Sequence, residues 1–125
     1  MWPYSKIDDE RVKFLQKYIT IKHNPNISDA YKIGVDTKLG EGYYVIDDVV
    51  FKKTFTYKNG NYPDGDACYE CYLNDLFIEF ETLSPLYKVK SGNVIEHTET
   101  FSLYKKPFDF DETDEKSVDK FLENI

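Results

Sequence analysis

A chain of 125 residues, 41% hydrophobic and 17% aromatic, is long enough to bury one core, and it is predicted to form a single domain of residues 1–125. Its net charge of −7 argues against binding to nucleic acid or to an anionic membrane through bulk electrostatics. No apolar run approaches the roughly 20 residues that span a bilayer, and no signal peptide is visible. Two cysteines do not make a disulfide framework, so a cytoplasmic setting is expected.

The first half of the chain alternates apolar and polar residues, as half-buried strands do. A short helical turn is predicted within residues 1–15, followed by strands at residues 18–21 and 31–35. Residues 43–46 and 49–57 are predicted to form a hairpin around an Asp-Asp turn. Because no helix separates these strands, their sheets should be antiparallel.

The second half continues this pattern and ends in a helix. Residues 68–73 and 76–83 are predicted to form another hairpin, residues 86–89 a brief strand, and residues 94–104 the longest strand. Apolar residues at helical spacing predict one helix over residues 114–125. The predicted fold class is therefore all-β, an antiparallel β-sandwich of about eight strands with a short C-terminal helix.

Ionisable residues occupy mid-strand positions that usually carry apolar side chains. Glu79 and Glu81 point to the same face of one predicted strand, and His97 and Glu99 have the same relation in another. A His–Glu pair of this kind can move protons. These residues are therefore candidates for a polar site on a β scaffold.

Two further strands repeat the pattern, with Lys53 and Glu70 in register with apolar and aromatic neighbours. If the strands are neighbours, one sheet face holds all six ionisable groups inside an aromatic rim. Such a surface suits a sugar, because carboxylates accept hydrogen bonds from hydroxyls and aromatic rings stack on C–H faces. The alternative is a solvated or bulged strand face, in which long Lys and Glu stems cover apolar surface while their heads reach water.

No metal or cofactor is expected. Cys68 and Cys71 have CxxC spacing, but residues three apart on a strand face opposite sides, so the two thiols diverge. The acidic stretches at residues 64–66 and 109–115 lack the spacing of a cation-binding loop. With only two histidines, one chain cannot build a multi-histidine metal site.

Residues 80–103 read FETLSPLYKVKSGNVIEHTETFSL. This run resembles the closing segment of galactose-mutarotase-like (aldose 1-epimerase-like) proteins, and in particular an uncharacterised branch of that superfamily. That branch shows a Glu-x-Glu-Thr-Leu-Gly-Pro strand, a Pro-Gly-Glu turn and a His-x-Glu strand, which correspond here to residues 79–85, 90–93 and 97–99. The turn departs from the pattern, because Ser and Asn flank its Gly.

Upstream motifs in the family's order extend the resemblance to residues 2–106, the predicted β core, and leave residues 107–125 as an acidic segment and helix. These motifs are Trp2-Pro3-Tyr4-Ser5, Tyr31-Lys32-Ile33-Gly34, Phe51-Lys52-Lys53-Thr54-Phe55 and Tyr62-Pro63-Asp64-Gly65. The resemblance implies an all-β supersandwich-type fold that binds carbohydrate on a concave sheet.

In mutarotases a strand Glu is the general base on the anomeric hydroxyl, and histidines act as acid and position the ring oxygen. By this resemblance Glu81 is the candidate base, Glu79 competes with it, and His97 is the candidate acid. The candidate ligand-binding residues are Lys32, Lys53, Glu70 and Glu99.

The chain resembles only the C-terminal half of such a domain. The half that carries most of the family's histidines is absent. We therefore expect the chain to bind a carbohydrate ligand, and aldose 1-epimerase-like isomerase activity is the weaker of the two expectations. Half a supersandwich also leaves an apolar sheet face uncovered, so a homodimer or a partner chain is expected. The alternative function is a non-enzymatic structural or interaction protein whose sheet face forms a subunit interface. A truncated reading frame is a third interpretation.

Overall fold

The computed structural model describes residues 1–125 as eight strands and two helices. The strands are β1 (Val12–Phe14), β2 (Ile19–Ile21), β3 (Tyr31–Val35), β4 (Glu41–Ile46), β5 (Val49–Phe55), β6 (Tyr69–Leu73), β7 (Ile78–Thr82) and β8 (Glu99–Lys105). The helices are α1 (Pro63–Asp66) and α2 (Glu115–Leu122). All strand pairs are antiparallel and form three sheets, with strand orders β1-β2, β3-β6-β7 and β4-β5-β8. The predicted all-β, sandwich-like fold class is confirmed.

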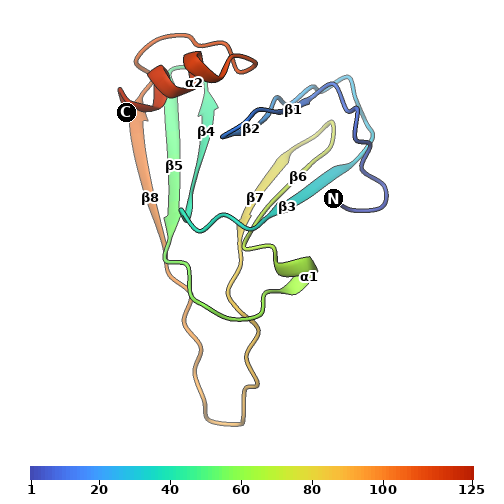
Figure 1. The fold of residues 1–125 in the computed structure, drawn as a ribbon, viewed down its shortest axis with the longest axis vertical. Helices are drawn as coiled ribbons and strands as arrows, with labels where there is room; N and C mark the ends of the chain where they lie inside the picture. Colours follow the sequence, from blue (N-terminus) through green and yellow to red (C-terminus); the bar gives the residue numbers. More distant parts are fainter.

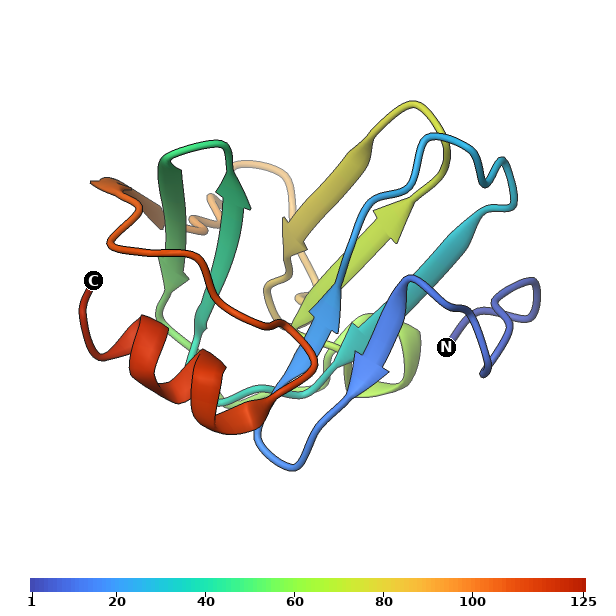
Figure 2. The same cartoon turned by 90° about the horizontal axis from the view of Figure 1, so that it is seen from above.

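The two three-stranded sheets stand beside each other and diverge from a common base (Figure 1). The β1-β2 pair and α2 lie together on one side of them (Figure 2). Side chains join these two elements: Lys17 and Tyr18 bond to Asp119, and Thr20 and Lys22 bond to Glu112. The acidic C-terminal segment is therefore tied to the N-terminal hairpin.

Two small clusters form the core, and only 16 of the 125 residues are buried. Val12, Tyr31, Ile33 and Leu73 pack between the β1-β2 pair and the β3-β6-β7 sheet. Phe55, Tyr62, Cys68 and Tyr69 pack where the two larger sheets meet. The sheets therefore share a core only near their common base, and much of each sheet face lies outside it.

Both predicted hairpins and the C-terminal helix are confirmed. Asp47 adopts a φ of 50° in the turn between β4 and β5, a left-handed conformation that Asp tolerates better than most residues. The helix α2 begins after Asp114, whose side chain accepts a hydrogen bond from Lys116 N at 3.2 Å. Neither helix has the length and apolar character needed to cross a bilayer.

Two predicted elements are wrong, and a third begins later than predicted. The helical turn within residues 1–15 is replaced by β1, which forms because Val12 pairs with Ile21 of β2. Residues 86–89 form no strand, and β8 begins at Glu99 rather than at residue 94. Glu99 pairs with Phe55, the last residue of β5, so residues 84–98 have no strand beside them and project from the base as a loop (Figure 1).

Candidate functional site

Strands β3, β6 and β7 bring three ionisable side chains together, which we call the Lys32 cluster: Lys32, Glu70 and Glu81. Glu70 lies directly opposite Glu81 in the strand register, so both point to the same sheet face. Lys32 Nζ lies 2.7 Å from Glu70 Oε2 and 2.9 Å from Glu81 Oε2. Glu79 shares this face but is exposed. The structure thus brings three of the predicted residues together, with the Lys32 ammonium group between the two carboxyl groups.

The two carboxyl groups of the Lys32 cluster differ in their environment. Glu70 is 3% exposed, and its Oε1 has no hydrogen-bond partner. Burial raises the pKa of Glu70 in spite of the ion pair with Lys32, and a hydrogen bond with Glu81 adds to the increase. Burial also acts on Glu81, but hydrogen bonds with Lys32 and Glu70 outweigh it and lower its pKa. The cluster therefore places one cation between two carboxyl groups whose pKa values are shifted in opposite directions.

The N-terminal segment covers the Lys32 cluster. Lys32 Nζ lies 4.9 Å from the centroid of the Trp2 ring, and Trp2 N donates to Lys32 O at 3.2 Å. Ser5 Oγ donates to the same carbonyl and accepts the Lys32 N–H, both at 2.8 Å. A hollow of about 170 Å³ adjoins this segment and is lined by Met1, Trp2, Pro3, Gly34 and Asp64.

A second group of polar side chains, the Lys53 cluster, consists of Lys53, Thr82, His97 and Glu99. Lys53 Nζ lies 3.1 Å from Glu99 Oε1 and donates to the carbonyl of Phe80 at 2.5 Å. The Thr82 hydroxyl donates to Glu99 Oε1 and lies 2.8 Å from His97 Nε2. Burial works against the charge of Glu99, but hydrogen bonds from Thr82 and Lys53 outweigh it and lower its pKa. The cluster links β7 to the β4-β5-β8 sheet.

The prediction that all six ionisable groups share a single polar sheet face is wrong. Successive residues of β7 point to opposite faces, so Glu81 joins the Lys32 cluster while Thr82 joins the Lys53 cluster. Glu81 and His97 therefore do not share a site. The roles of Glu81 or Glu79 as base and of His97 as acid stay predictions that this geometry does not favour.

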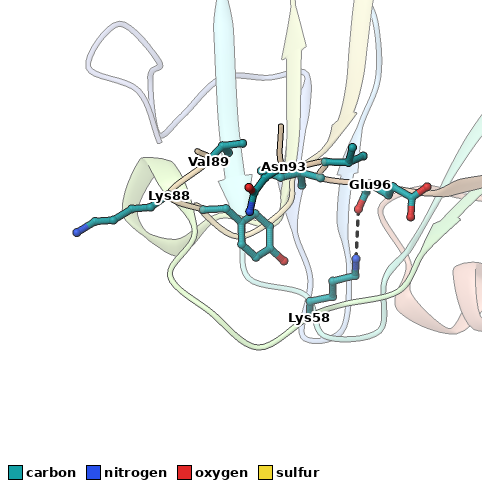
Figure 3. Close-up of a pocket in the computed structure, with 8 residues that line it drawn as sticks. Lys58, Lys88, Val89, Asn93 and Glu96 are labelled. Carbon is teal, nitrogen blue, oxygen red and sulfur yellow. Dashed lines mark hydrogen bonds between the residues drawn. The ribbon is translucent and has the colours of Figure 1, made fainter. Parts of the chain in front are cut away.

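A separate hollow of about 290 Å³ lies within the loop at residues 84–98 (Figure 3). Its lining residues are Lys58, Tyr87, Lys88, Val89, Asn93, Val94, Ile95 and Glu96. Lys58 Nζ donates to the Glu96 carbonyl at 3.2 Å, which ties the loop to the segment after β5. None of the predicted site residues lines this hollow, and no group of three or more His, Cys, Asp and Glu side chains is placed to hold a metal ion.

One face of the β4-β5-β8 sheet carries Lys53 and Glu99 near its base and is apolar and uncovered beyond them, and we call this uncovered part the open face. It carries Tyr44, Ile46, Val49, Phe51, Phe101 and Leu103. Leu103 pairs with Phe51, which pairs with Tyr44, so the three side chains form one row across the sheet. Leu103 is 72% exposed and Tyr44 is 37% exposed at the two ends of this row, and Phe101 is 57% exposed. The uncovered apolar face expected from the sequence is therefore present, and β8 is its most exposed part.

One buried ion pair lies outside the sequence-based predictions. The Arg11 guanidinium donates to both carboxylate oxygens of Asp9, from Nε at 2.9 Å and from Nη2 at 2.7 Å. It also donates to the carbonyls of Ile27 and Asp29. Only 1% of the Arg11 side chain and 8% of the Asp9 side chain are exposed. The Asp-x-Arg spacing is the only sequence signal, and it does not distinguish a buried pair from a surface pair.

No family model, no curated protein and no solved structure matches this chain. The resemblance to galactose-mutarotase-like proteins stays a prediction from the sequence motifs.

Proposed function

We propose that this protein is a non-enzymatic interaction protein that self-associates through the β8 side of its open face. The observation that carries the proposal is the exposure of Phe101 and Leu103 at 57% and 72% on a strand that pairs on one side only. Large apolar side chains gathered on one exposed surface mark interaction sites, because their removal from water is favourable.

The charges on β8 favour a second copy of this chain as the partner. Glu99 lies at one end of the strand and Lys105 at the other, on the same face as the two exposed apolar residues. Two copies of β8 in opposite directions bring each charge toward its opposite. The proposed interface is therefore complementary to itself, as a two-fold interface must be.

Sedimentation velocity over a wide concentration range tests this function. The wild-type chain is expected to form a dimer, and Leu103→Glu is expected to sediment as a monomer. The matched control is Leu76→Glu, because Leu76 is 78% exposed but lies in the turn between β6 and β7, outside the open face. A monomeric wild type, or equal loss of the dimer in both variants, would overturn the proposal.

Carbohydrate binding at the Lys32 cluster is a second candidate. Glu79 and Glu81 share a sheet face near the Trp2 ring and the hollow of about 170 Å³ beside it, and this combination suits sugar hydroxyls and a stacked ring. An NMR titration with common aldoses tests it. Saturable shifts of Trp2 and Glu81 amides, without shifts at Val94 in the distant loop, support binding, and unchanged spectra exclude it.

A further inference from the structure

The outer edge of β8 is unpaired. β8 hydrogen-bonds only to β5, and no other element lies along its far side (Figure 1). Lys106 N donates to the carbonyl of Asp48 at 2.6 Å, so the even-numbered residues of β8 direct their peptide groups to β5. The odd-numbered residues from Glu99 to Lys105 therefore direct their N–H and C=O groups to the free edge. An edge strand of this kind is a template for pairing with another chain.

We infer that β8 pairs with β8 of a second copy, antiparallel and centred on Ser102, so that two three-stranded sheets become one six-stranded sheet. This inference rests on the proposed self-association and specifies its geometry. In this register Glu99 faces the partner's Lys105, and Phe101 faces the partner's Leu103. The Ser102 residues of the two copies meet on the two-fold axis.

Backbone direction and side-chain chemistry together select this register. Hydrogen bonds across the new edge require odd-numbered residues to face odd-numbered residues, which restricts the alternatives to shifts by two. A shift of two in one direction places Glu99 opposite the partner's Leu103. The opposite shift places Lys105 against the partner's Phe101. Only the register centred on Ser102 pairs charge with opposite charge and apolar side chain with apolar side chain.

Both charged groups are free to make the new contact. The bonds that Glu99 makes to Thr82 and Lys53 all use Oε1, which leaves Oε2 for a partner. Lys105 is exposed and forms no ion pair within the chain. The pairing also places the two most exposed apolar residues of β8 beside each other, so each covers part of the other's apolar surface.

Disulfide trapping tests the register. Across the two-fold axis the Ser102 Cα atoms would lie about 4.5 Å apart, as in a non-hydrogen-bonded antiparallel pair, and this separation falls within the disulfide range. Oxidised Ser102→Cys is therefore expected to form a covalent dimer. The matched control is Thr100→Cys on the same face, because its two copies would be displaced by roughly 13 Å along the strands. The wild-type chain, with Cys68 and Cys71 alone, gives the background.

The outcomes separate this inference from the proposed function. A covalent dimer from Ser102→Cys, with neither the control variant nor the wild type cross-linked, supports the pairing. A stable wild-type dimer in which Ser102→Cys does not cross-link, or cross-links no faster than Thr100→Cys, overturns the pairing but leaves self-association intact. A wild-type chain that stays monomeric overturns both.

Discussion

Glu81 and Thr82 are consecutive in β7 but bond to different parts of the molecule. Glu81 accepts a hydrogen bond from Lys32 Nζ at 2.9 Å, on the sheet face beside Trp2. Thr82 Oγ1 lies 2.8 Å from His97 Nε2, on the face toward the β4-β5-β8 sheet. Because strand residues alternate between faces, β7 divides the ionisable groups into two clusters. Each cluster joins side chains from three strands, which assigns these residues a role in stability.

Removal of the Lys32 ammonium should destabilise the fold strongly. Lys32→Met leaves the carboxyls of Glu70 and Glu81 without their shared cation, and Glu70 is 3% exposed. Loss of one partner from a buried ion pair costs about 3–5 kcal/mol, and the low end is expected because Glu70 can take up a proton. Urea unfolding monitored by circular dichroism measures this. The control Lys90→Met, in the exposed loop, should change the free energy of unfolding by less than about 0.5 kcal/mol.

Glu70→Gln should be tolerated, and the stability of the variant relative to the wild type should increase as pH rises. The pKa of Glu70 is raised in the folded state by burial, so its contribution to stability is present below its ordinary value of 4.5 and is lost as pH rises through the folded value. The glutamine amide does not ionise in this pH range, so its contribution to stability does not change with pH. Unfolding free energies of both proteins at pH 5 and pH 8 measure the difference, and an unchanged difference would contradict the raised pKa.

Asp9→Asn should weaken the N-terminal fold because it leaves the Arg11 charge buried without a carboxylate. The expected loss is about 3 kcal/mol or more in the free energy of unfolding. Asp29→Asn is the control, since it removes a surface pair with Lys6 in which both side chains are at least 60% exposed, and such pairs contribute about 0–1 kcal/mol. Equal losses in the two variants would exclude a special role for the buried pair.

The same ion pair predicts loss of stability in acid. A hydrogen bond from Arg11 lowers the pKa of Asp9 below its ordinary value of 3.8, so this contribution is present above pH 3.8 and is lost as pH falls through the folded value. The wild-type chain should therefore lose stability more steeply below pH 4 than Asp9→Asn does. Thermal unfolding midpoints between pH 2.5 and pH 6 measure the two slopes, and parallel curves would contradict the prediction.

Gly42→Ala should destabilise the junction between the two larger sheets. A Cβ at Gly42 would lie 2.4 Å from Phe80 Cζ and 2.8 Å from Tyr69 Oη, so one ring has to move. Overpacking of this kind costs about 1–3 kcal/mol. Phe80→Leu removes the clashing ring, so the double variant should lose less than the sum of the two single losses. If the losses in the free energy of urea unfolding were additive, the contact between the new Cβ and the Phe80 ring would not be the source of the strain.

Lys105→Glu should weaken the proposed dimer. It places a carboxylate opposite Glu99 at two symmetry-related positions. Because like charges directly opposite each other are destabilising, the dimer dissociation constant should increase by about fivefold or more. Lys90→Glu makes the same change of charge in the exposed loop and controls for net charge. Sedimentation equilibrium at low salt measures both constants. Equal weakening in the two variants would contradict the pairing of Glu99 with Lys105.

The strand pattern was predictable from the sequence wherever local chemistry determines it. Alternation identified β3, β4, β5, β6 and β7, because side chains of a half-buried strand alternate between core and solvent whatever lies beside them. The helix α2 was predictable from its apolar spacing. The same alternation also grouped Glu79 with Glu81, and His97 with Glu99, on shared faces.

Which of these groups meet was decided only by the tertiary structure. A strand needs a partner for its backbone hydrogen bonds, so β1 exists because β2 is beside it, and residues 94–98 remain a loop because β5 ends at Phe55. Likewise, alternation shows that Glu81 and Thr82 point in opposite directions, but it does not show that Lys32 lies on one side and His97 on the other. The sequence by itself thus determined the faces of the strands, and the packing of the sheets determined the polar clusters and left β8 with a free edge.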